Sequence, residues 1–202
     1  MSHGTLFIVS APSGAGKTSL VAELLRRNRN IKASISHTTR PRRPGEKNGV
    51  NYHFTKKADF LKMIDEQAFL EHALVFSHYY GTSHAWVVET LAQGIHVILE
   101  IDWQGAEQAR TKFPDSKSIF ILPPSIQALE DRLNTRGQDD PDVIVKRLSA
   151  AKEEMSHYTE ANYIIINDDF NIALEQLESF IYKQWPSNVN NLDTSLIQKL
   201  LS

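Results

Sequence analysis

The 202-residue sequence contains no cysteine, which excludes disulfide bonds and thiolate metal sites. Its eight histidines are scattered, and no pair has the spacing of a zinc motif. Long apolar runs are also missing: no window approaches the roughly 18 apolar residues of a membrane-spanning helix. The first residues do not form the charged-then-apolar pattern of a signal peptide. These absences predict a soluble cytoplasmic protein without a membrane partner.

An excess of charge of one sign is likewise absent. The 22 basic residues nearly balance the 24 acidic residues, which gives a net charge of -2. A protein with this balance has no overall field for polyanions, so we expect no nucleic-acid partner. The length and the hydrophobic content of 41% suit one compact unit that can bury a full core.

Apolar residues alternate between short runs typical of buried strands and longer runs with helical spacing. The strand candidates are Leu6–Val9, Ile95–Leu99, Ser118–Leu122 and Tyr163–Ile166. A helical pattern follows each of them, which is the signature of a parallel sheet covered by helices on both faces. Residues 31–82 break this rhythm and predict a smaller, more antiparallel insertion.

The first strand candidate leads into a glycine-containing loop and then into a helical pattern. Gly14, Gly16, Lys17 and Thr18 match the sequence pattern of a phosphate-binding loop. The glycines let backbone N–H groups turn inward to the phosphate oxygens, and the positive end of the following helix adds to this field. Lys17 supplies a charge for the β- and γ-phosphates, while the Thr18 hydroxyl is a candidate Mg²⁺ ligand. Ala11 departs from the pattern, which has glycine there, so a simple turn before a lysine remains the alternative.

A second anion site is predicted within the insertion, where three arginines occur in four residues, from Arg40 to Arg43. Guanidinium groups bind phosphate with two parallel hydrogen bonds. The alternative is a solvated basic loop. Four residues of the same insertion favour a binding site, namely Tyr52, Glu71, Tyr80 and Thr82. For Glu71 the alternative is a strand residue that faces solvent, which the alternation of residues 70–72 leaves open.

Charged residues also follow the later strand and helix candidates. Glu100 and Asp102 come at the end of a buried strand, and this end of a parallel sheet is where ligands bind. Asp102 could instead cap the next helix. Arg132, Arg136 and Arg147 lie in or beside a polar segment; they are either phosphate-neutralising groups or surface residues paired with nearby aspartates.

Together the motifs resemble those of the bacterial guanylate kinases, over about residues 5–180. The matching segments are Ser10–Lys17, Ser36–Arg40, Tyr79–Thr82, Leu99–Gly105, Arg136–Gln138 and Ile166–Asp169. Members of that family commonly carry alanine at the position of Ala11. The resemblance implies an α/β P-loop NTPase fold with a central five-stranded parallel sheet flanked by helices, a small mixed α/β GMP-binding insertion and a helical lid.

The resemblance also implies boundaries: a core of residues 1–32, 84–125 and 155–185, an insertion of 33–83, a lid of 126–154 and a tail of 186–202. The implied activity is Mg²⁺-dependent transfer of the γ-phosphoryl group of ATP to GMP, giving ADP and GDP. We expect dGMP to be accepted too, because no residue is identified that must read the ribose 2′-hydroxyl. The sequence leaves homo-oligomerisation open.

Site residues follow from the motifs and the resemblance together. The expected ATP site comprises Ala11, Pro12, Ser13, Gly14, Ala15, Gly16, Lys17, Thr18 and Asn167. The expected GMP site comprises Ser36, Arg40, Arg43, Tyr52, Glu71, Tyr80, Thr82 and Asp102. Lys17, Arg132, Arg136 and Arg147 are the expected catalytic residues, and Thr18 and Glu100 are the metal candidates.

Two other functions stay open at this point. The first is a non-catalytic interaction module related to guanylate kinases, in which the ATP loop is often degraded. The intact Lys17 and Thr18 speak against it. The second is a kinase for another small phosphate ester. Against it, guanine presents two adjacent donors, and a carboxylate such as Glu71 can accept a hydrogen bond from each. Adenine inverts this pattern, so these residues favour a guanine acceptor.

Overall fold

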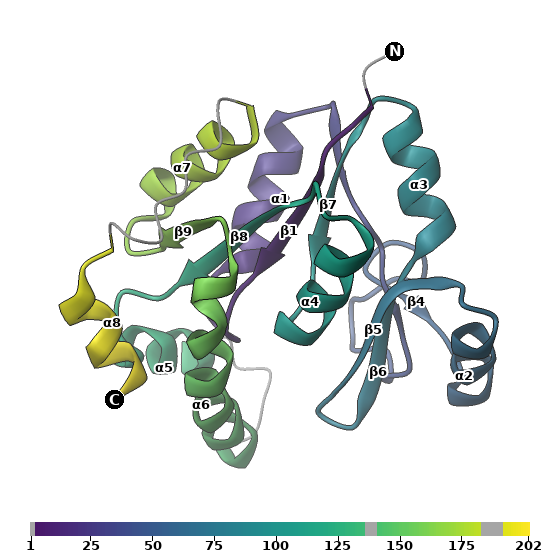
Figure 1. The fold of residues 1–202 in the computed structure, drawn as a ribbon. Coiled ribbons are helices and arrows are strands. Elements are labelled where there is room, and N and C mark those ends of the chain that lie inside the picture. Colours follow the sequence, from purple (N-terminus) through teal and green to yellow (C-terminus); the bar gives the residue numbers. More distant parts are fainter. Residues whose placement is uncertain (1–2, 136–140, 183–191) are drawn as a thin grey trace. The chain divides into compact units, whose positions relative to one another are not determined.

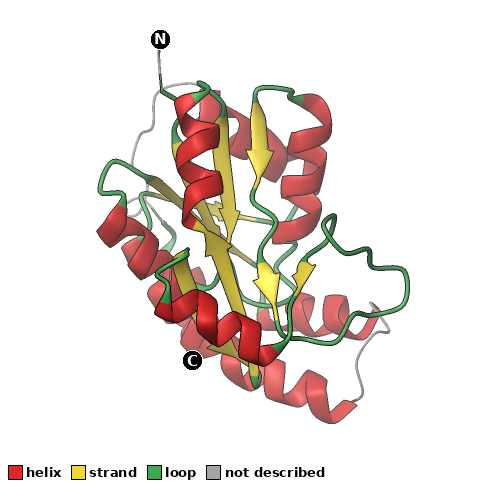
Figure 2. Cartoon of the chain, turned by 90° about the vertical axis from the view of Figure 1, so that its right-hand side faces the viewer, coloured by secondary structure: helices red, strands yellow, loops and turns green. Residues whose placement is uncertain are grey.

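The computed structural model describes residues 3–135, 141–182 and 192–202 (Figure 1). Its larger sheet has five strands in the order β2 (Ile31–Ala33), β7 (His96–Glu100), β1 (Leu6–Ser10), β8 (Lys117–Leu122) and β9 (Tyr163–Ile166). The β2–β7 and β8–β9 pairings are parallel, and helices, red in Figure 2, flank the strands. The predicted fold class is confirmed. The chain forms two compact units, of residues 1–8 with 30–116 and of residues 9–29 with 117–202.

The first unit contains a second, mixed sheet, as the irregular pattern of residues 31–82 predicts. This sheet has the order β4-β3-β6-β5. The strands β3–β6 and β5–β6 pair antiparallel, while β3 and β4 pair parallel. Its strands are β3 (His37–Thr38), β4 (His53–Phe54), β5 (Phe69–Val75) and β6 (His78–Ser83). The other elements of this unit are β2 (Ile31–Ala33), α2 (Lys57–Asp65), α3 (His84–Ala92), β7 (His96–Glu100) and α4 (Trp103–Lys112).

Burial of apolar side chains from strands and helices forms the core of this first unit. Leu70 of β5, Val87 of α3 and Val97 of β7 are fully buried in one cluster. Ala106 and Ala109 of α4 join the same cluster, and their small side chains let this helix approach β5 closely. Packing of α4 on β5 is important for the site described below.

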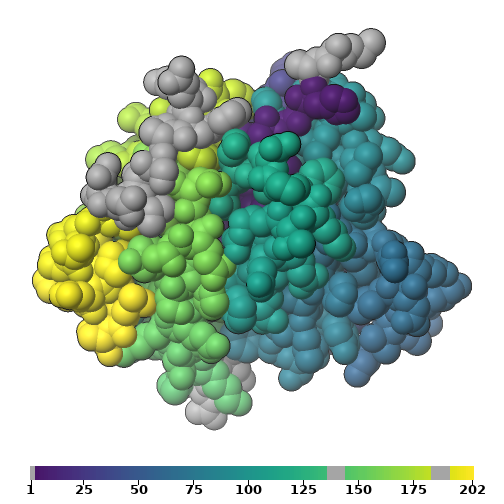
Figure 3. Space-filling model, in the orientation of Figure 1, coloured from purple at the N-terminus to yellow at the C-terminus, as the bar shows by residue number. Residues whose placement is uncertain are grey.

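The second unit carries the phosphate loop and the last two strands. Its elements are α1 (Lys17–Arg27), β8 (Lys117–Leu122), α5 (Ile126–Thr135), α6 (Pro141–Ser156), the 3-10 helix η1 (His157–Glu160), β9 (Tyr163–Ile166), α7 (Phe170–Tyr182) and α8 (Thr194–Leu201). Strand β1 (Leu6–Ser10) is divided between the two units. In Figure 3, α8 (yellow) lies against α6 (green). The Ser125 hydroxyl accepts a hydrogen bond from Ala128 N at 3.0 Å, as expected for the residue that caps α5.

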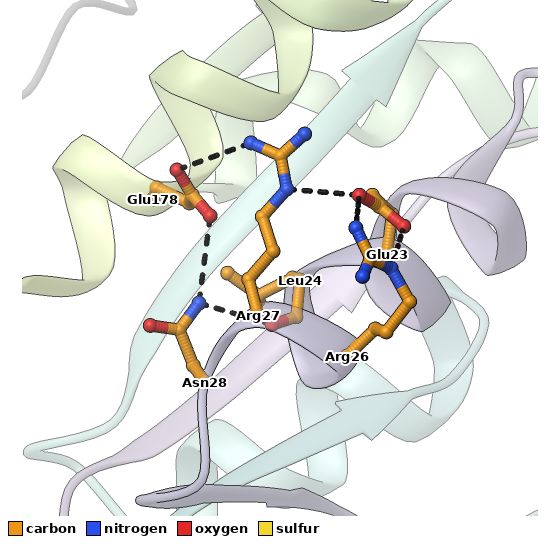
Figure 4. A network of polar contacts seen from close by, with 6 residues as sticks. All are labelled: Glu23, Leu24, Arg26, Arg27, Asn28 and Glu178. Carbon is orange, nitrogen blue, oxygen red and sulfur yellow. Dashed lines mark hydrogen bonds and ion pairs between the residues drawn. The ribbon is translucent and has the colours of Figure 1, made fainter.

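Helix α1 packs against α7, and a polar network ties the two together (Figure 4). Arg27 contacts Glu23 at 2.8 Å and Glu178 of α7 at 3.9 Å. Asn28 donates to the backbone oxygen of Leu24 at 3.0 Å and to Glu178 at 3.4 Å. The network fixes the C-terminal end of the helix whose N-terminus forms the phosphate loop.

Candidate active site

The phosphate loop occupies the connection between β1, which ends at Ser10, and α1, which begins at Lys17. Gly14 and Gly16 have φ angles of 92° and 93°, which side-chain-bearing residues rarely adopt. A Cβ atom on Gly16 would lie 2.3 Å from Asn167 Nδ2. Both glycines are therefore required by backbone conformation, and Gly16 also by the close approach of another side chain.

A cavity of about 680 Å³ opens beside this loop, within the second unit. Seven predicted residues line it: Pro12, Gly14, Gly16, Lys17, Thr18, Arg132 and Asn167. The remaining lining residues were not predicted: Ser19, Asp131, Leu133, Thr135, Asp168 and Phe170. Ala11, Ser13 and Ala15 belong to the loop but do not line the cavity. Asp168 could have been predicted from the sequence, because it follows Asn167 directly after β9.

Asn167 is 4% exposed and holds the phosphate loop itself. Its Nδ2 atom donates a hydrogen bond to the backbone oxygen of Ala15 at 2.7 Å. Arg132 in turn donates from Nη2 to the backbone oxygen of Asn167 at 2.8 Å. The side-chain amide of Asn167 thus acts on the loop backbone, a role that the sequence did not predict.

Replacing Asn167 is expected to weaken binding of any triphosphate, whatever its base. Asn167→Ala removes the hydrogen bond to Ala15, whereas Asn167→Asp places a carboxylate oxygen against the Ala15 carbonyl. The aspartate variant should therefore bind triphosphates more weakly than the alanine variant. We expect dissociation constants about tenfold higher for ATP and for inorganic tripolyphosphate, the order of one lost buried hydrogen bond. Titration calorimetry with both ligands checks this. Loss of ATP affinity alone would show that Asn167 reads adenine instead.

Two of the three predicted lid arginines, Arg132 of α5 and Arg147 of α6, make contacts near the loop. Arg147 of α6 donates to the Ser13 hydroxyl at 3.3 Å, and Glu154 of the same helix accepts from Ser13 N at 3.0 Å. The Nη1 atom of Arg132 is buried and has no hydrogen-bond partner among the described residues. Arg136 lies outside the described residues. Sequence analysis missed Glu154, which lies 141 positions from Ser13.

A smaller cavity of about 150 Å³ lies within the first unit. Six polar residues line it: Ser36, Tyr52, Glu71, Tyr80, Glu100 and Asp102. Ala73, Val75 and Ile101 add apolar surface. Five of the eight residues predicted to bind the acceptor nucleotide are therefore brought together, along with Glu100.

Glu71 is the most unusual of these residues, because it is a carboxyl group with only 2% of its surface exposed. Desolvation by burial raises the pKa of Glu71 to about 7, against hydrogen bonds from Thr82 that lower it. The Asp102 carboxylate raises this pKa further, and Lys112 lowers it. The alternative of a solvent-facing Glu71 is wrong. A buried carboxyl group at a cavity is a candidate for binding a ligand that donates hydrogen bonds.

Asp102 combines the two roles that the sequence left open. Its Oδ1 atom accepts a hydrogen bond from Gly105 N at 2.9 Å and so caps α4. The same residue lines the small cavity. The cap fixes the start of α4, so that the carboxyl group is held at one position on the cavity wall.

The arginine-rich segment is organised by Glu46, which sequence analysis did not select. Glu46 Oε1 lies 2.6 Å from Arg40 Nη2, and its Oε2 accepts from Arg43 N at 2.7 Å. The Arg40 guanidinium also lies over the ring of Tyr52, with 5.4 Å to the centroid. Arg40 and Arg43 do not line the small cavity. Arg40 is therefore held beside Tyr52, a residue that does.

The two metal candidates line different cavities: Thr18 the large one and Glu100 the small one. Over residues 3–135, 141–182 and 192–202, no group of three or more acidic or histidine side chains could hold a metal ion. Over the same ranges, no helix has the length and hydropathy needed to cross a membrane.

A glycine loop between a strand and a helix, next to a cavity lined by an arginine whose Nη1 atom is buried, defines a P-loop protein that binds phosphate groups. A family model for guanylate kinase matches residues 3–184. Guanylate kinases of Saccharophagus degradans and Vibrio cholerae are 55% and 58% identical to the chain. The first alignment covers 98% of both sequences, and the second covers 90% of this chain and 88% of the relative.

A solved structure supports the same assignment. The guanylate kinase of Anaplasma phagocytophilum is 30% identical, with a TM-score of 0.75 over 96% of this chain and 89% of that one. The chain belongs to the guanylate kinase family. The predicted resemblance and the predicted class of enzyme, a nucleotide phosphotransferase, are confirmed.

Proposed function

We propose that this protein transfers the γ-phosphoryl group of ATP to GMP and releases ADP and GDP. The single observation that carries the proposal is the buried Glu71 carboxyl group on the wall of the small cavity. Guanine offers its N1–H and its exocyclic amine as adjacent donors, which one carboxylate accepts together. Adenine lacks that pair of donors, so its binding would leave Glu71 unpaired.

The residues of the small cavity are assigned to GMP. Ser36 supplies a hydroxyl group for guanine O6, and Asp102 supports the same end of the site. Thr82 is buried outside the cavity lining and contributes through its hydrogen bonds to Glu71. Tyr52 and Tyr80 bind the phosphate together with Arg40 and Arg43. Glu46 holds the Arg40 side chain beside Tyr52, which lowers the entropy cost of binding the phosphate. We propose dGMP as a second acceptor, because no residue is assigned to the ribose 2′-hydroxyl.

The residues of the large cavity are assigned to ATP. Backbone N–H groups of Gly14 and of residues 16–18 bind the phosphates, and the Lys17 side chain binds the β- and γ-phosphates. The buried Nη1 of Arg132 donates to the phosphate chain, and Arg147 and Arg136 are assigned to neutralising its charge. Residues 126–154 act as the lid, residues 33–83 as the acceptor-binding insertion, and the remaining core carries the phosphate loop.

The proposed reaction is direct transfer of the phosphoryl group from ATP to GMP. An oxygen of the GMP phosphate forms a bond to the γ-phosphorus as the bond to the ADP oxygen breaks, without a covalent enzyme intermediate. Lys17 and the arginines stabilise the negative charge of the transferring group. Mg²⁺, held by Thr18 and the substrate phosphates, would supply further charge neutralisation, since Mg²⁺ is bound by few protein groups in such sites. Glu100 is the candidate to orient its water shell.

An acceptor series tests the proposal. ADP release is followed with GMP, AMP, CMP and UMP at equal concentrations in a coupled assay. We expect turnover on GMP and at least about 10³-fold lower kcat/KM on AMP, since unpaired buried groups discriminate strongly. Equal rates on all four acceptors, or none on GMP, would show that the protein has another substrate.

A further inference from the structure

Strand β5 carries Glu71 at the edge of the mixed sheet, where, among the described strands, it pairs with β6 alone. Its pairing register shifts between Phe69 and Glu71, so the strand is irregular next to the carboxyl group. Edge strands with irregular pairing are weakly fixed by their own sheet. The position of Glu71 therefore needs support from outside the sheet.

Helix α4 supplies that support through three residues on its face toward β5. Gln108 binds the backbone of His72 twice: Oε1 accepts from His72 N at 3.1 Å, and Nε2 donates to His72 O at 2.8 Å. Lys112 donates from Nζ to Phe69 O at 3.1 Å. The strand is thus attached to α4 on both sides of Glu71.

Gly105 of the same helix makes room for the carboxyl group itself. A Cβ atom on Gly105 would lie 2.5 Å from Glu71 Oε2. The spacing of Gly105, Gln108 and Lys112 by three and four residues places them on one side of a helix. That helix is capped by Asp102, which lines the same cavity as Glu71. One helix therefore sets the positions of both carboxyl groups.

We propose that Gln108 is a positioning residue that fixes Glu71 and so sets the selectivity of the acceptor site for the guanine 2-amino group. The proposal rests on the proposed function, in which Glu71 accepts hydrogen bonds from guanine. The two bonds to His72 hold the backbone adjacent to Glu71 in a single register. A shift of this backbone would move the carboxylate away from one of the two guanine donors. Gln108 itself lies outside the cavity lining and acts through the strand.

Two variants of Gln108 test this inference. Gln108→Met keeps the side-chain volume and removes both bonds to His72. Gln108→Glu keeps the acceptor for His72 N but sets a second oxygen against His72 O. The matched control is Glu107→Gln, because Glu107 is the neighbouring residue of α4 and its side chain is exposed. KM and kcat are measured with ATP and with two acceptors, GMP and inosine monophosphate, which has the N1–H but no 2-amino group.

We expect the KM for GMP to rise about tenfold in both Gln108 variants, since displacements below an ångström have effects of this order. The KM for inosine monophosphate should rise less, so that the ratio of the two kcat/KM values falls several-fold. The KM for ATP should stay within twofold of the wild type, and the control should match the wild type throughout. A merely structural role would lower activity on both acceptors equally.

An unchanged GMP to inosine monophosphate ratio in a folded Gln108 variant would overturn the inference. If Gln108→Met does not fold, as judged by its thermal unfolding, the Gln108→Glu variant decides. Failure of the proposed function gives a different result, because the wild-type protein itself would then show no preference for GMP.

Discussion

Lys17→Ala is expected to lower kcat by a factor of at least about 10², the usual cost of removing one group that stabilises transition-state charge. Lys17 lies at the first position of α1 and lines the large cavity. The negative charge of the transferring phosphoryl group is spread over its oxygens, and the ammonium group is placed to offset it. Alanine favours the helix, so the free energy of unfolding should change little.

The measurement is steady-state kinetics with ATP and GMP, together with thermal unfolding of the variant. Lys199→Ala is a suitable control, because Lys199 is an exposed lysine of α8 in the same unit. Its kcat should equal that of the wild type. A Lys17→Ala variant that folds normally and keeps more than a tenth of the wild-type kcat would remove Lys17 from the catalytic residues.

Glu71→Gln is expected to raise the dissociation constant of GMP about 10²-fold. The carboxylate accepts two charge-assisted hydrogen bonds from guanine, each contributing about 1.5–3 kcal/mol. Glutamine has the same shape, but its amide group presents a donor to one of the two guanine donors. The affinity for ATP should not change, because Glu71 belongs to the small cavity. Titration calorimetry with each nucleotide alone separates the two effects.

The affinity of the wild-type protein for GMP should depend on pH in a predictable direction. With its pKa raised to about 7, Glu71 is protonated below that pH and cannot accept both guanine hydrogen bonds. The dissociation constant should therefore be level above pH 7 and rise about tenfold for each unit below it. The Asp102 carboxylate, Lys112 and the Thr82 hydrogen bonds also act on this pKa.

Comparison with Glu71→Gln isolates the contribution of Glu71 to this pH dependence, because the phosphate of GMP also titrates, with a pKa of about 6. The glutamine variant should retain only the pH dependence of the phosphate. Identical pH profiles for the two proteins would contradict the assignment of Glu71 to guanine.

The phosphate loop was predictable because its information is local. Strand, glycines, lysine and helix follow one another between Leu6 and Arg27, and each residue type has a direct physical reason there. The central strands were predictable for a similar reason, since continuous apolar runs such as residues 118–122 are buried on both faces. Strand β2 was missed, because only Ile31 of its three residues is buried.

Contacts between distant residues were not predictable from spacing. Gln108 binds His72 over 36 positions, and Asn167 binds Ala15 over 152 positions. An amide side chain carries no signal in a sequence that tells which backbone group it will bind. Glu46 is different, because it lies only six positions from Arg40. A single acidic residue within an arginine-rich loop was a visible signal for an internal ion pair.

Glu71 was selected from the sequence as a candidate site residue, but the burial of its side chain was not predicted. Alternation in residues 70–72 left the burial of its side chain undecided. The structure buries it because α4, a separate element, covers β5 and leaves room for the carboxyl group at Gly105. Burial then produces the raised pKa, which no sequence pattern contains.

The most direct test of phosphoryl transfer to GMP is to follow the γ-phosphate of ATP. The protein is incubated with Mg²⁺ and ATP labelled at the γ-phosphate, with GMP, with AMP, or without acceptor, and the products are separated. We predict that the label moves into GDP when GMP is present and stays in ATP in the other two reactions. Two results would contradict phosphoryl transfer to GMP. One is release of the label as inorganic phosphate at the same rate in all three reactions, and the other is transfer of the label to AMP as readily as to GMP.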